Sequence, residues 1–459
     1  MIRLAFDGAT ANAILAHVRG NAPDEEGAFC LLRQGRGSEG TRLLATRALL
    51  PREEDWESRK IDQLRPKAQW ISQMVSEAIS SKAGLLFVHS HPDLRHPVGL
   101  SAVDESAFTS LARTIAPMLD GPFAALVIHP AGWSGVVWQD ERLIRLDRVY
   151  ALARTLRWLS PRLAQPISQI DLRQRDALGS IHQELQDLDV GVVGCGGIGS
   201  PLAEELARMG VRSIRLVDLD VLDTPSNVRR VFGSSGADLQ AAVPPAKVDI
   251  VGRHIDRLVL GVPVRRVHGD VRAESVFRSL LDTDVVLCGT DTHGSRAIVN
   301  ELASTYFLPV IDVGVRVGSR AEAVLCGLLA EIRVLTPTTL CLWCRQIIDA
   351  DVIRAENLPD EERTKLAREG YVSGSVGAPA PSVTALTVFA SGMAGCALLG
   401  LLSEDVSDVP SAYWFDGLMG DAGALNLQEP VAGCICRKHF GLGDMASIPF
   451  VPDPATVGH

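Results

Sequence analysis

The sequence predicts an α/β protein of two domains, in which the second domain has a mainly parallel sheet. Three observations favour this class. Residues 189–220 combine an apolar strand pattern, a glycine-rich turn, an amphipathic helix pattern and a second apolar strand. A helix pattern over 67–80, followed by an apolar strand over 85–88, lies well before that stretch. The chain of 459 residues is long enough for two or three domains with separate hydrophobic cores.

The composition is that of an ordinary globular protein, with 46% hydrophobic and 22% charged residues. The net charge of −10 argues against a general nucleic-acid or membrane-surface binder. The N-terminus lacks a charged region followed by an apolar core, and no stretch reaches about 18 uninterrupted apolar residues. We therefore expect a cytoplasmic protein. Its nine cysteines are expected to be reduced thiols, some of which form a metal site.

The elements of the first domain follow from short apolar runs. Strands are expected over 28–32, 42–48 and 123–128, and WSGVVW is expected to form a hairpin. The polar segment PREEDWESRKIDQLRPK is typical of a surface loop. Residues 143–188 have a mostly helical pattern with breaks at two prolines. We place the first domain at 1–155, a linker at 156–172 and the second domain at 173–459.

The strand over 85–88 leads into a concentration of polar residues, HSHPDLRHPVGLSAVDESAF. His89 and His91 are two residues apart at the end of a strand, so their imidazoles point to one side. Ser101 and Asp104 follow at the start of an expected helix, whose first turn can bring the carboxylate back to the histidines. Two imidazoles and one carboxylate leave a fourth zinc position for water, as in a hydrolytic site. Ser-x-x-Asp is also the pattern of a helix capping box, which needs no metal.

These residues resemble the JAB/JAMM metalloprotease family, whose pattern is a glutamate, then His-x-His-Pro, then Ser-x-x-Asp. The resemblance implies three zinc ligands, which are His89, His91 and Asp104. It further implies that Ser101 helps to hold the oxyanion and that Glu25 is the general base, with Glu26 as the alternative. Nine residues separate His91 from Ser101, a longer gap than in the commoner eukaryotic form. Members of this family cleave peptide or isopeptide bonds after the C-terminal glycine of ubiquitin-like proteins.

In the second domain, a glycine-rich turn follows the apolar run 190–193 directly. Its glycines are Gly194, Gly196, Gly197 and Gly199. Glycines let backbone N–H groups approach a phosphate, and the N-terminus of the following helix adds partial positive charge. The next strand ends at Asp218, 24 residues after the first glycine, where a carboxylate can accept hydrogen bonds from ribose hydroxyls. We therefore expect a nucleotide here.

The polar residues that follow distinguish nucleotidyl transfer from hydride transfer. Candidates for nucleotide binding after the ribose-binding strand are Asp220, Asn227, Arg229, Arg230 and Lys247. Hydride transfer has no evident use for this set, whereas nucleotidyl transfer must neutralise the charge that moves from the triphosphate onto pyrophosphate. A later strand, expected over 284–288, leads to Asp291, where a carboxylate can hold Mg²⁺ on the phosphates.

These residues, in this order, resemble the ThiF/MoeB family of adenylyltransferases, which have the Rossmann-like fold of ubiquitin-activating enzymes. The resemblance implies that the four glycines line the ATP phosphates and that Asp218 binds the ribose. The residues implied to contact the triphosphate or its magnesium ion are Asn227, Arg230, Lys247 and Asp291. Arg173 is implied to reach the ATP of a second subunit in a homodimer, with Arg175 as the alternative. Arg229 and Val231 depart from the residues common in the family.

Two close cysteine pairs lie near the C-terminal end, Cys341 with Cys344 and Cys434 with Cys436. Four thiolates in two pairs form a closed structural zinc site, and the ThiF/MoeB resemblance places such a site at these two points. His439 is an alternative ligand.

In family members that form a thioester with the carrier, the nucleophilic cysteine lies between these two pairs. Residues 347–383 contain no cysteine, so a thioester with this chain is not expected. Cys396 follows in an apolar pattern and is expected to be buried packing.

Together these patterns predict a bifunctional enzyme. The first domain would cleave at the C-terminus of a ubiquitin-like carrier protein with a catalytic zinc ion, and the second would adenylate the exposed carboxylate with ATP and Mg²⁺. The product would enter sulfur transfer or a bacterial ubiquitin-like conjugation pathway, with a sulfur donor or a conjugating enzyme as the next partner. Neither nucleic acid nor a membrane is an expected partner. The competing interpretations are an NAD-dependent Rossmann oxidoreductase and a non-catalytic scaffold that retains both folds.

Overall fold

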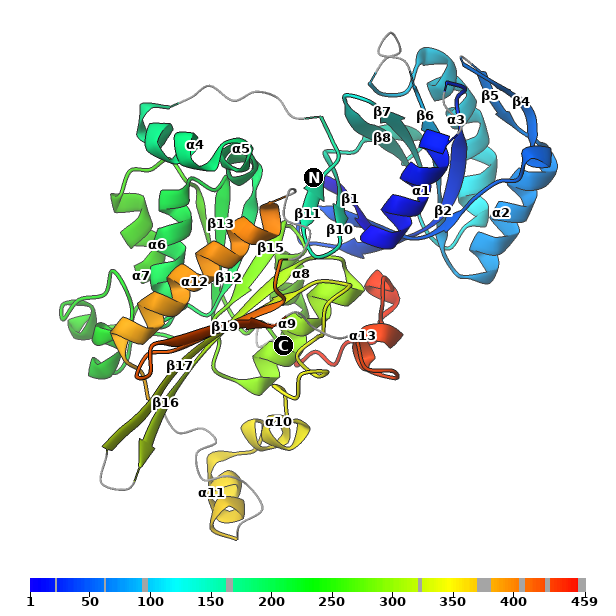
Figure 1. The fold of residues 1–459 in the computed structure, drawn as a ribbon. Coiled ribbons are helices and arrows are strands. Elements are labelled where there is room, and N and C mark those ends of the chain that lie inside the picture. Colours follow the sequence, from blue (N-terminus) through cyan, green and yellow to red (C-terminus); the bar gives the residue numbers. More distant parts are fainter. Residues whose placement is uncertain are drawn as a thin grey trace. The chain divides into compact units, whose positions relative to one another are not determined.

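Figure 1 shows the fold of the chain in a computed structural model. The structure describes residues 1–452 except 21–22, 62, 93–97, 162–167, 321–323, 370–380, 404–408 and 426–429. The chain forms two compact units. The first comprises Met1–Ala164, Thr305–Phe307 and His439–Ser447, and the second comprises Gln165–Ser304, Leu308–Lys438 and Ile448–His459. The units therefore interleave along the sequence, and part of the expected linker, 162–167, lies outside the described residues.

The first unit is built on a nine-stranded mixed sheet in the order β11-β10-β1-β3-β2-β6-β7-β8-β9. Its strands are β1 (Ile2–Asp7), β2 (Gly27–Arg36), β3 (Thr41–Leu49), β6 (Gly84–Ser90), β7 (Phe123–His129), β8 (Gly132–Gln139), β9 (Arg142–Arg145), β10 (Arg148–Leu152) and β11 (Leu156–Trp158). β1 runs parallel to β3 and β10, and β6 runs parallel to β7, whereas the other neighbours are antiparallel. A separate antiparallel hairpin consists of β4 (Trp56–Lys60) and β5 (Gln63–Pro66).

Side chains alternate between the two faces of the sheet along each strand, so apolar side chains lie on both faces. Helices cover both of them. On one face, α1 (Gly8–Gly20) packs Ile14 into a core that includes Leu86 of β6. On the other face, α2 (Ala68–Ser80) and α3 (Ala102–Ile115) cover a second core that includes Leu85 of the same strand. The strand β6 is thus buried on both faces, and its C-terminal end presents the paired histidines.

Two expectations for this unit are wrong. The charged segment 51–67 is not a plain surface loop, because it contains both strands of the β4–β5 hairpin. The segment expected to be helical from residue 143 begins with strands β9, β10 and β11, and helices start only at α4. The strands expected over 28–32, 42–48 and 123–128 and the helix over 67–80 are confirmed.

The second unit has an eight-stranded mixed sheet in the order β14-β13-β12-β15-β16-β17-β18-β19. Its strands are β12 (Asp189–Val193), β13 (Ser213–Asp218), β14 (Val264–His268), β15 (Val285–Cys288), β16 (Val310–Arg320), β17 (Val324–Leu335), β18 (Ala412–Asp416) and β19 (Asp421–Leu425). Neighbours from β14 to β16 are parallel, and neighbours from β16 to β19 are antiparallel. The α/β class is confirmed, but an antiparallel extension makes the sheet mixed.

The helices of this unit are α4 (Leu172–Leu178), α5 (Ser180–Asp187), α6 (Gly199–Met209), α7 (Lys247–Arg257), α8 (Glu274–Leu280), α9 (His293–Thr305), α10 (Ala350–Glu356), α11 (Asp360–Arg368), α12 (Thr384–Leu402) and α13 (Ile435–Lys438). The chain crosses from β12 to β13 on one side of the sheet centre and later reaches β15 on the other side. Such a switch point leaves a crevice at the carboxyl ends of the strands, where open α/β sheets bind ligands.

One described helix, α12, is long and apolar enough to cross a membrane by composition alone. It packs against α6, β16 and β17, and 56% of its apolar window is buried within the unit, as is typical of a core helix. The prediction that Cys396 on this helix is buried is wrong, because its side chain is exposed.

Candidate functional sites

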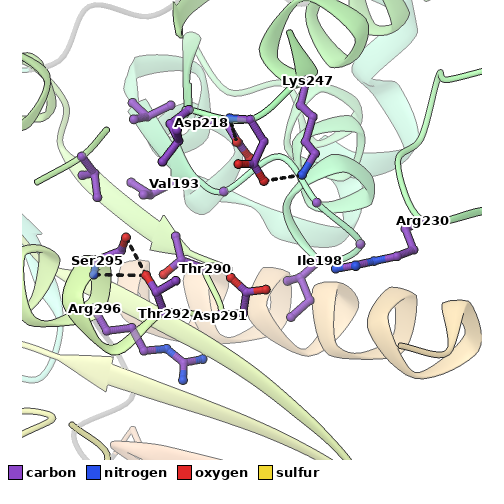
Figure 2. Close-up of a pocket in the computed structure, with 18 of the residues that line it drawn as sticks. Val193, Ile198, Asp218, Arg230, Lys247, Thr290, Asp291, Thr292, Ser295 and Arg296 are labelled. Carbon is purple, nitrogen blue, oxygen red and sulfur yellow. Dashed lines mark hydrogen bonds and ion pairs between the residues drawn. The ribbon is translucent and has the colours of Figure 1, made fainter. Parts of the chain in front are cut away.

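The second unit contains a cavity of about 290 Å³ at the carboxyl ends of β12, β13 and β15 (Figure 2). Its walls are the glycine turn after β12, the residues after β13, the start of α7 and the loop 289–292 that leads to α9. The predicted site residues that line it are Gly194, Gly196, Gly197, Asp218, Asp220, Arg230, Lys247 and Asp291. The fold therefore brings together most of the predicted nucleotide-binding residues in one crevice.

Three expected contacts, Gly199, Asn227 and Arg229, are not among the described residues that line this cavity. Gly199 lies behind the turn, where a Cβ atom would collide with the carbonyl oxygen of Gly194, so this glycine lets α6 start against the end of β12. Asn227 is not among the described lining residues, and its Nδ2 donates instead to the hydroxyl of Thr224 at 2.8 Å. Gly194 itself has φ +90, a conformation that favours glycine.

Asp218 is fixed at the edge of the cavity by two backbone amides. Its Oδ2 accepts from the Cys195 N–H at 2.5 Å, and its Oδ1 accepts from the Asp220 N–H at 2.7 Å. Burial raises the pKa of Asp218, although the nearby Lys247 ammonium opposes this shift. A carboxylate held in this way can accept hydrogen bonds from ribose hydroxyls.

Two cations lie on the side of the glycine turn. Lys247 begins α7, and its Nζ donates to Asp220 Oδ2 at 2.6 Å. Arg230 lies beside Gly196 and Gly197, and its buried Nε has no hydrogen-bond partner among the described residues. Because buried polar groups are normally paired, this guanidinium is suited to an anionic ligand.

The opposite wall is formed by the loop after β15 and the first turn of α9. Figure 2 shows the exposed Asp291 projecting between this loop and Ile198, across from the two cations. Beside it, the hydroxyls of Thr292 and Ser295 form a hydrogen bond of 2.8 Å. The cavity thus combines cations and a carboxylate, the groups that hold a triphosphate and a divalent cation.

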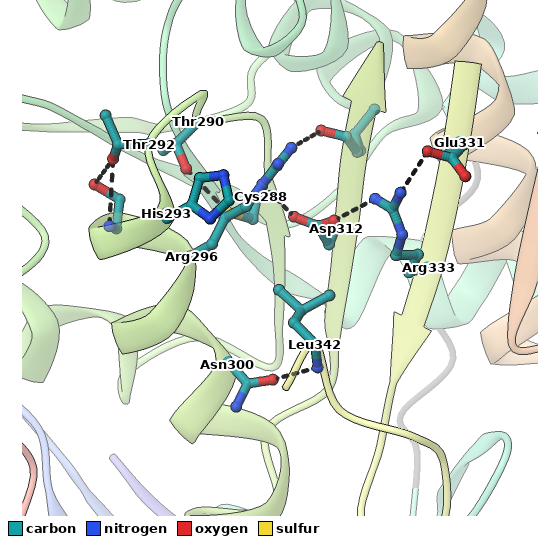
Figure 3. A network of polar contacts seen from close by, with 12 residues as sticks. Cys288, Thr290, Thr292, His293, Arg296, Asn300, Asp312, Glu331, Arg333 and Leu342 are labelled. Carbon is teal, nitrogen blue, oxygen red and sulfur yellow. Dashed lines mark hydrogen bonds and ion pairs between the residues drawn. The ribbon is translucent and has the colours of Figure 1, made fainter. Parts of the chain in front are cut away.

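The sequence patterns did not identify Arg296, which also lines the cavity. Figure 3 shows Arg296 among the polar side chains that surround it. Its Nε lies 3.1 Å from Oδ1 of Asp312, and Arg333 Nη1 donates to Oδ2 of the same aspartate at 2.8 Å. Arg333 also pairs with Glu331 at 2.6 Å. Asp312 is fully buried, so its charge is stabilised by the two guanidinium groups, and it raises the pKa of Arg296. The only feature of the sequence that could have identified Arg296 is its position one turn into the helix that follows Asp291.

A second missed residue is Glu356, at the end of α10. Its two carboxylate oxygens accept from the backbone N–H groups of His293 and Gly294, each at 2.8 Å. His293 Nδ1 also accepts from the Asp349 N–H at 3.1 Å. These bonds cap the N-terminus of α9 and hold it against α10. Because α9 follows Asp291 directly, Glu356 is placed to position that loop.

The four paired cysteines form one cluster whose sulfur atoms all lie within 4.8 Å of one another. Sγ of Cys341 lies 3.5 Å from Sγ of Cys434, and Sγ of Cys344 lies 3.8 Å from Sγ of Cys436. Four sulfurs at the Zn–S distance of about 2.3 Å would be about 3.8 Å apart in a tetrahedron, so this cluster could bind a metal ion. A hydrogen bond from Cys436 lowers the pKa of Cys341 to about 5.

His439, the alternative ligand, is not part of this cluster among the described residues. α9 supports the first cysteine pair, because Asn300 Oδ1 accepts from the Leu342 N–H at 2.8 Å (Figure 3).

The two candidate arginines for contact with a second subunit lie at the start of this unit. Arg173 is exposed on α4, and Arg175 forms an ion pair with Asp176 at 2.6 Å. Neither is among the described residues that line the cavity. The trans contact therefore stays a prediction.

In the first unit, the end of β6 and the start of α3 bring His89, His91 and Asp104 together. One ligand atom from each lies within 4.8 Å of the others. Asp104 Oδ2 lies 3.7 Å from His89 Nε2 and 3.5 Å from His91 Nε2. Burial raises the pKa of Asp104, but the two neighbouring imidazoles outweigh burial and hold the pKa well below its usual range.

The capping-box alternative is present together with this cluster. Ser101 Oγ accepts from the Asp104 N–H at 3.2 Å, and Asp104 Oδ2 accepts from the Ser101 N–H at 2.8 Å. The cap therefore fixes the carboxylate next to the histidines. Both ring nitrogens of His89 are buried without a hydrogen-bond partner among the described residues, which suits an imidazole that coordinates a metal ion.

The structure places only one of the two candidate bases in this site. Glu25 Oε1 lies 4.0 Å from His91 Nε2, and Glu25 lines the same cavity as the histidines. Glu26 faces elsewhere, because its carboxylate pairs with Arg59 at 2.7 Å and with His17 at 3.3 Å.

The chain is similar to several known proteins. The sulfur carrier protein ThiS adenylyltransferase of Bacillus subtilis (strain 168) is 29% identical over 168 residues, which cover 37% of this chain and 46% of that protein. The SUMO-activating enzyme subunit 2 of Dictyostelium discoideum is 28% identical over 37% of this chain and 24% of that protein. The chain thus spans less than half the length of these relatives. A crystal structure of E. coli MccB covers 62% of this chain and 74% of that chain with 16% identity and a TM-score of 0.44.

The model of the ThiF family matches residues 168–432, more than half of the chain. This match starts just before α4 and ends just before the second cysteine pair, so it contains every residue that lines the nucleotide cavity. The chain belongs to the ThiF family.

Proposed function

We propose that the second unit adenylates the C-terminal carboxylate of a ubiquitin-like or sulfur carrier protein with ATP. The observation that carries this proposal is the cavity itself, in which Arg230 and Lys247 lie on the side of the glycine turn and Asp291 lies on the opposite wall. Membership of the ThiF family and the relatives named above support it. An oxidoreductase that binds NAD would need the glycine turn and Asp218, but it would leave this cation set without a purpose.

In the proposed reaction, a carboxylate oxygen of the carrier attacks the α-phosphorus of ATP, and the bond to the bridging oxygen of pyrophosphate breaks. Lys247 and Arg230 would neutralise the charge that accumulates on the leaving pyrophosphate. Asp218 would hold the ribose, so that the α-phosphate lies at the glycine turn. Asp291 would hold Mg²⁺, which screens the phosphate charges when bound. A carboxylate is a poor electrophile, and its mixed anhydride with AMP is a good one.

The product acyl-adenylate would pass to an external nucleophile. Residues 347–383 contain no cysteine, so this chain offers no thiol in the segment where related enzymes form a thioester. A sulfur donor or the cysteine of a conjugating enzyme would therefore complete the transfer. Arg173 or Arg175 of a second subunit would complete the ATP site of a homodimer. The cysteine cluster would hold a structural zinc ion.

We also propose that the first unit is a JAB/JAMM-type zinc metallopeptidase that acts on the C-terminus of the same carrier. His89, His91 and Asp104 would hold zinc, which polarises the scissile carbonyl and acidifies water when bound. Glu25 would take a proton from the attacking water and give it to the leaving nitrogen. The Ser101 hydroxyl would donate a hydrogen bond to the oxyanion. Cleavage would expose the carboxylate that the second unit uses.

Carrier-dependent exchange of pyrophosphate into ATP tests the first proposal. We expect exchange only when a small protein that ends in Gly-Gly is added, with no binding of NAD. Zinc-dependent cleavage of a carrier extended beyond Gly-Gly tests the second proposal. Loss of cleavage in His91→Ala with unchanged exchange would separate the two activities, whereas unchanged cleavage in that variant would overturn the zinc assignment.

A further inference from the structure

The candidate zinc site of the first unit opens into a cavity of about 610 Å³. Glu25, His89, His91 and Asp104 are among the residues that line this cavity. The volume is about twice that of the nucleotide cavity and lies in the range of small-molecule binding sites, about 300–1,000 Å³. It is therefore larger than attack on a peptide bond by water requires.

Beyond the histidines and the carboxylates, most of the residues that line this cavity are apolar, and the polar exceptions include Ser101 and Gln63. Aromatic side chains come from the central strands, Phe29 from β2 and Phe87 from β6, and aliphatic side chains come from α2 and α3, Ile71 and Leu111. The charged side chains Lys60 and Arg65 lie on the exposed hairpin β4–β5 at the rim. The hairpin is tied to the proposed base, because the Glu25 N–H donates to the carbonyl oxygen of Lys60 at 3.0 Å.

These contacts define what the cavity can hold. An acidic side chain could pair with Lys60 or Arg65, but both are exposed and exposed ion pairs contribute little, whereas a large apolar side chain would bury its surface against the rest of the wall. The glycine on the carrier side of the scissile bond has no side chain to place there. Of the two residues that flank the scissile bond, the one on the leaving side is therefore the one with a side chain to fill the cavity.

We propose that this cavity is a specificity pocket for a large apolar residue that follows the scissile glycine, as in a carrier precursor with a short C-terminal extension. This inference rests on the proposed metallopeptidase function. It names a substrate chemistry that the metal ligands do not determine, because water could attack any amide bond that is held at this site. The occupant is the side chain of a leaving residue such as phenylalanine or leucine.

The test uses two variants of α3 in the full-length chain. Ala107 lines the cavity and is exposed, so Ala107→Phe would fill the cavity mouth without disturbing the core. Ser106 is an exposed neighbour that does not line the cavity, so Ser106→Phe is the matched control. Thermal unfolding of both variants verifies that they fold as the wild type does.

Binding is measured with fluorescent peptides of one sequence that end in Gly-Gly-Phe, Gly-Gly-Gly or Gly-Gly-Asp, added to the Glu25→Gln protein. We expect the phenylalanine peptide to bind roughly 10- to 100-fold more tightly than the other two. Ala107→Phe should remove this preference, and Ser106→Phe should keep it. Equal binding of the three peptides, or a preference that survives Ala107→Phe, would overturn the proposal.

Cleavage by the zinc-loaded protein with intact Glu25 distinguishes this inference from the function on which it rests. If no peptide or extended carrier is cleaved, the metallopeptidase proposal fails, while the binding result still decides whether the cavity selects apolar residues. A peptide with Gly-Gly joined to the ε-amino group of lysine is included. Faster cleavage of this isopeptide than of Gly-Gly-Phe would show that the cavity takes a lysine stem, which would overturn the proposed occupant.

Discussion

Replacement of Asp312 by asparagine tests whether the buried charge network beside the nucleotide cavity positions Arg296. The Asp312 side chain is fully buried and lies between Arg296 and Arg333, whose side chains are 15% and 7% exposed. The asparagine side chain would have nearly the same shape but no charge, so two buried guanidinium groups would lose their counter-ion. Breaking a buried pair by removing one partner costs about 3–5 kcal/mol. Glu331 stays paired with Arg333, so we expect the lower end, about 3 kcal/mol.

Urea unfolding of the full-length chain, followed by fluorescence, measures this loss. Arg316→Ala is the matched control, because Arg316 is 73% exposed and lies 3.6 Å from Glu331, and exposed pairs contribute about 0–1 kcal/mol. The KM for ATP in pyrophosphate exchange should rise in Asp312→Asn, because Arg296 would lose its fixed position at the cavity wall. A loss of stability no larger than that of Arg316→Ala, with an unchanged KM, would refute this reasoning.

Three further predictions concern other carboxylates. Glu356→Gln leaves one oxygen for two backbone N–H groups, so we expect the free energy of unfolding to fall by about 1–2 kcal/mol and the KM for ATP to rise. The control is Asp351→Asn on the same helix, which should change neither quantity because Asp351 is exposed. Burial raises the pKa of Glu205 from 4.5 to about 7, so the free energy of unfolding should fall as pH rises through this window. In urea unfolding, the stability of Glu205→Gln relative to the wild type should be about 1–3 kcal/mol greater at pH 8 than at pH 5. Glu25→Gln should abolish peptide cleavage while zinc analysis finds the metal retained, and Glu26→Gln should lower the unfolding temperature but keep cleavage; the reverse pattern would exchange their roles.

The sequence predicts the sites well where short motifs carry the chemistry. The glycine turn with Asp218, and the histidine pair with Asp104, each lie on adjoining elements, so their spacing fixes their proximity. Contacts that depend on distant segments are not visible in spacing. Asp312 and Glu356 contact α9 because β16 and α10 pack beside that helix. Nothing in the local sequence marks either residue as a partner of α9.

Two of the wrong predictions from the sequence also have a physical reason, which is that tertiary packing is not visible in the local pattern. The hairpin β4–β5 is charged because it is exposed on its own and does not join the main sheet, so its composition matched a loop. α12 is apolar on nearly every face, so its pattern could not tell which side is buried, and Cys396 lies on the exposed side. Tertiary packing decides such cases, and periodicity does not.

The most direct test of the account is exchange of labelled pyrophosphate into ATP by the full-length chain, with and without a small protein that ends in Gly-Gly. We expect carrier-dependent exchange that falls at least about 100-fold in Asp291→Asn, because the carboxylate across from Lys247 would no longer hold magnesium on the phosphates. Exchange that needs no carrier, or that is unchanged in Asp291→Asn, would contradict it.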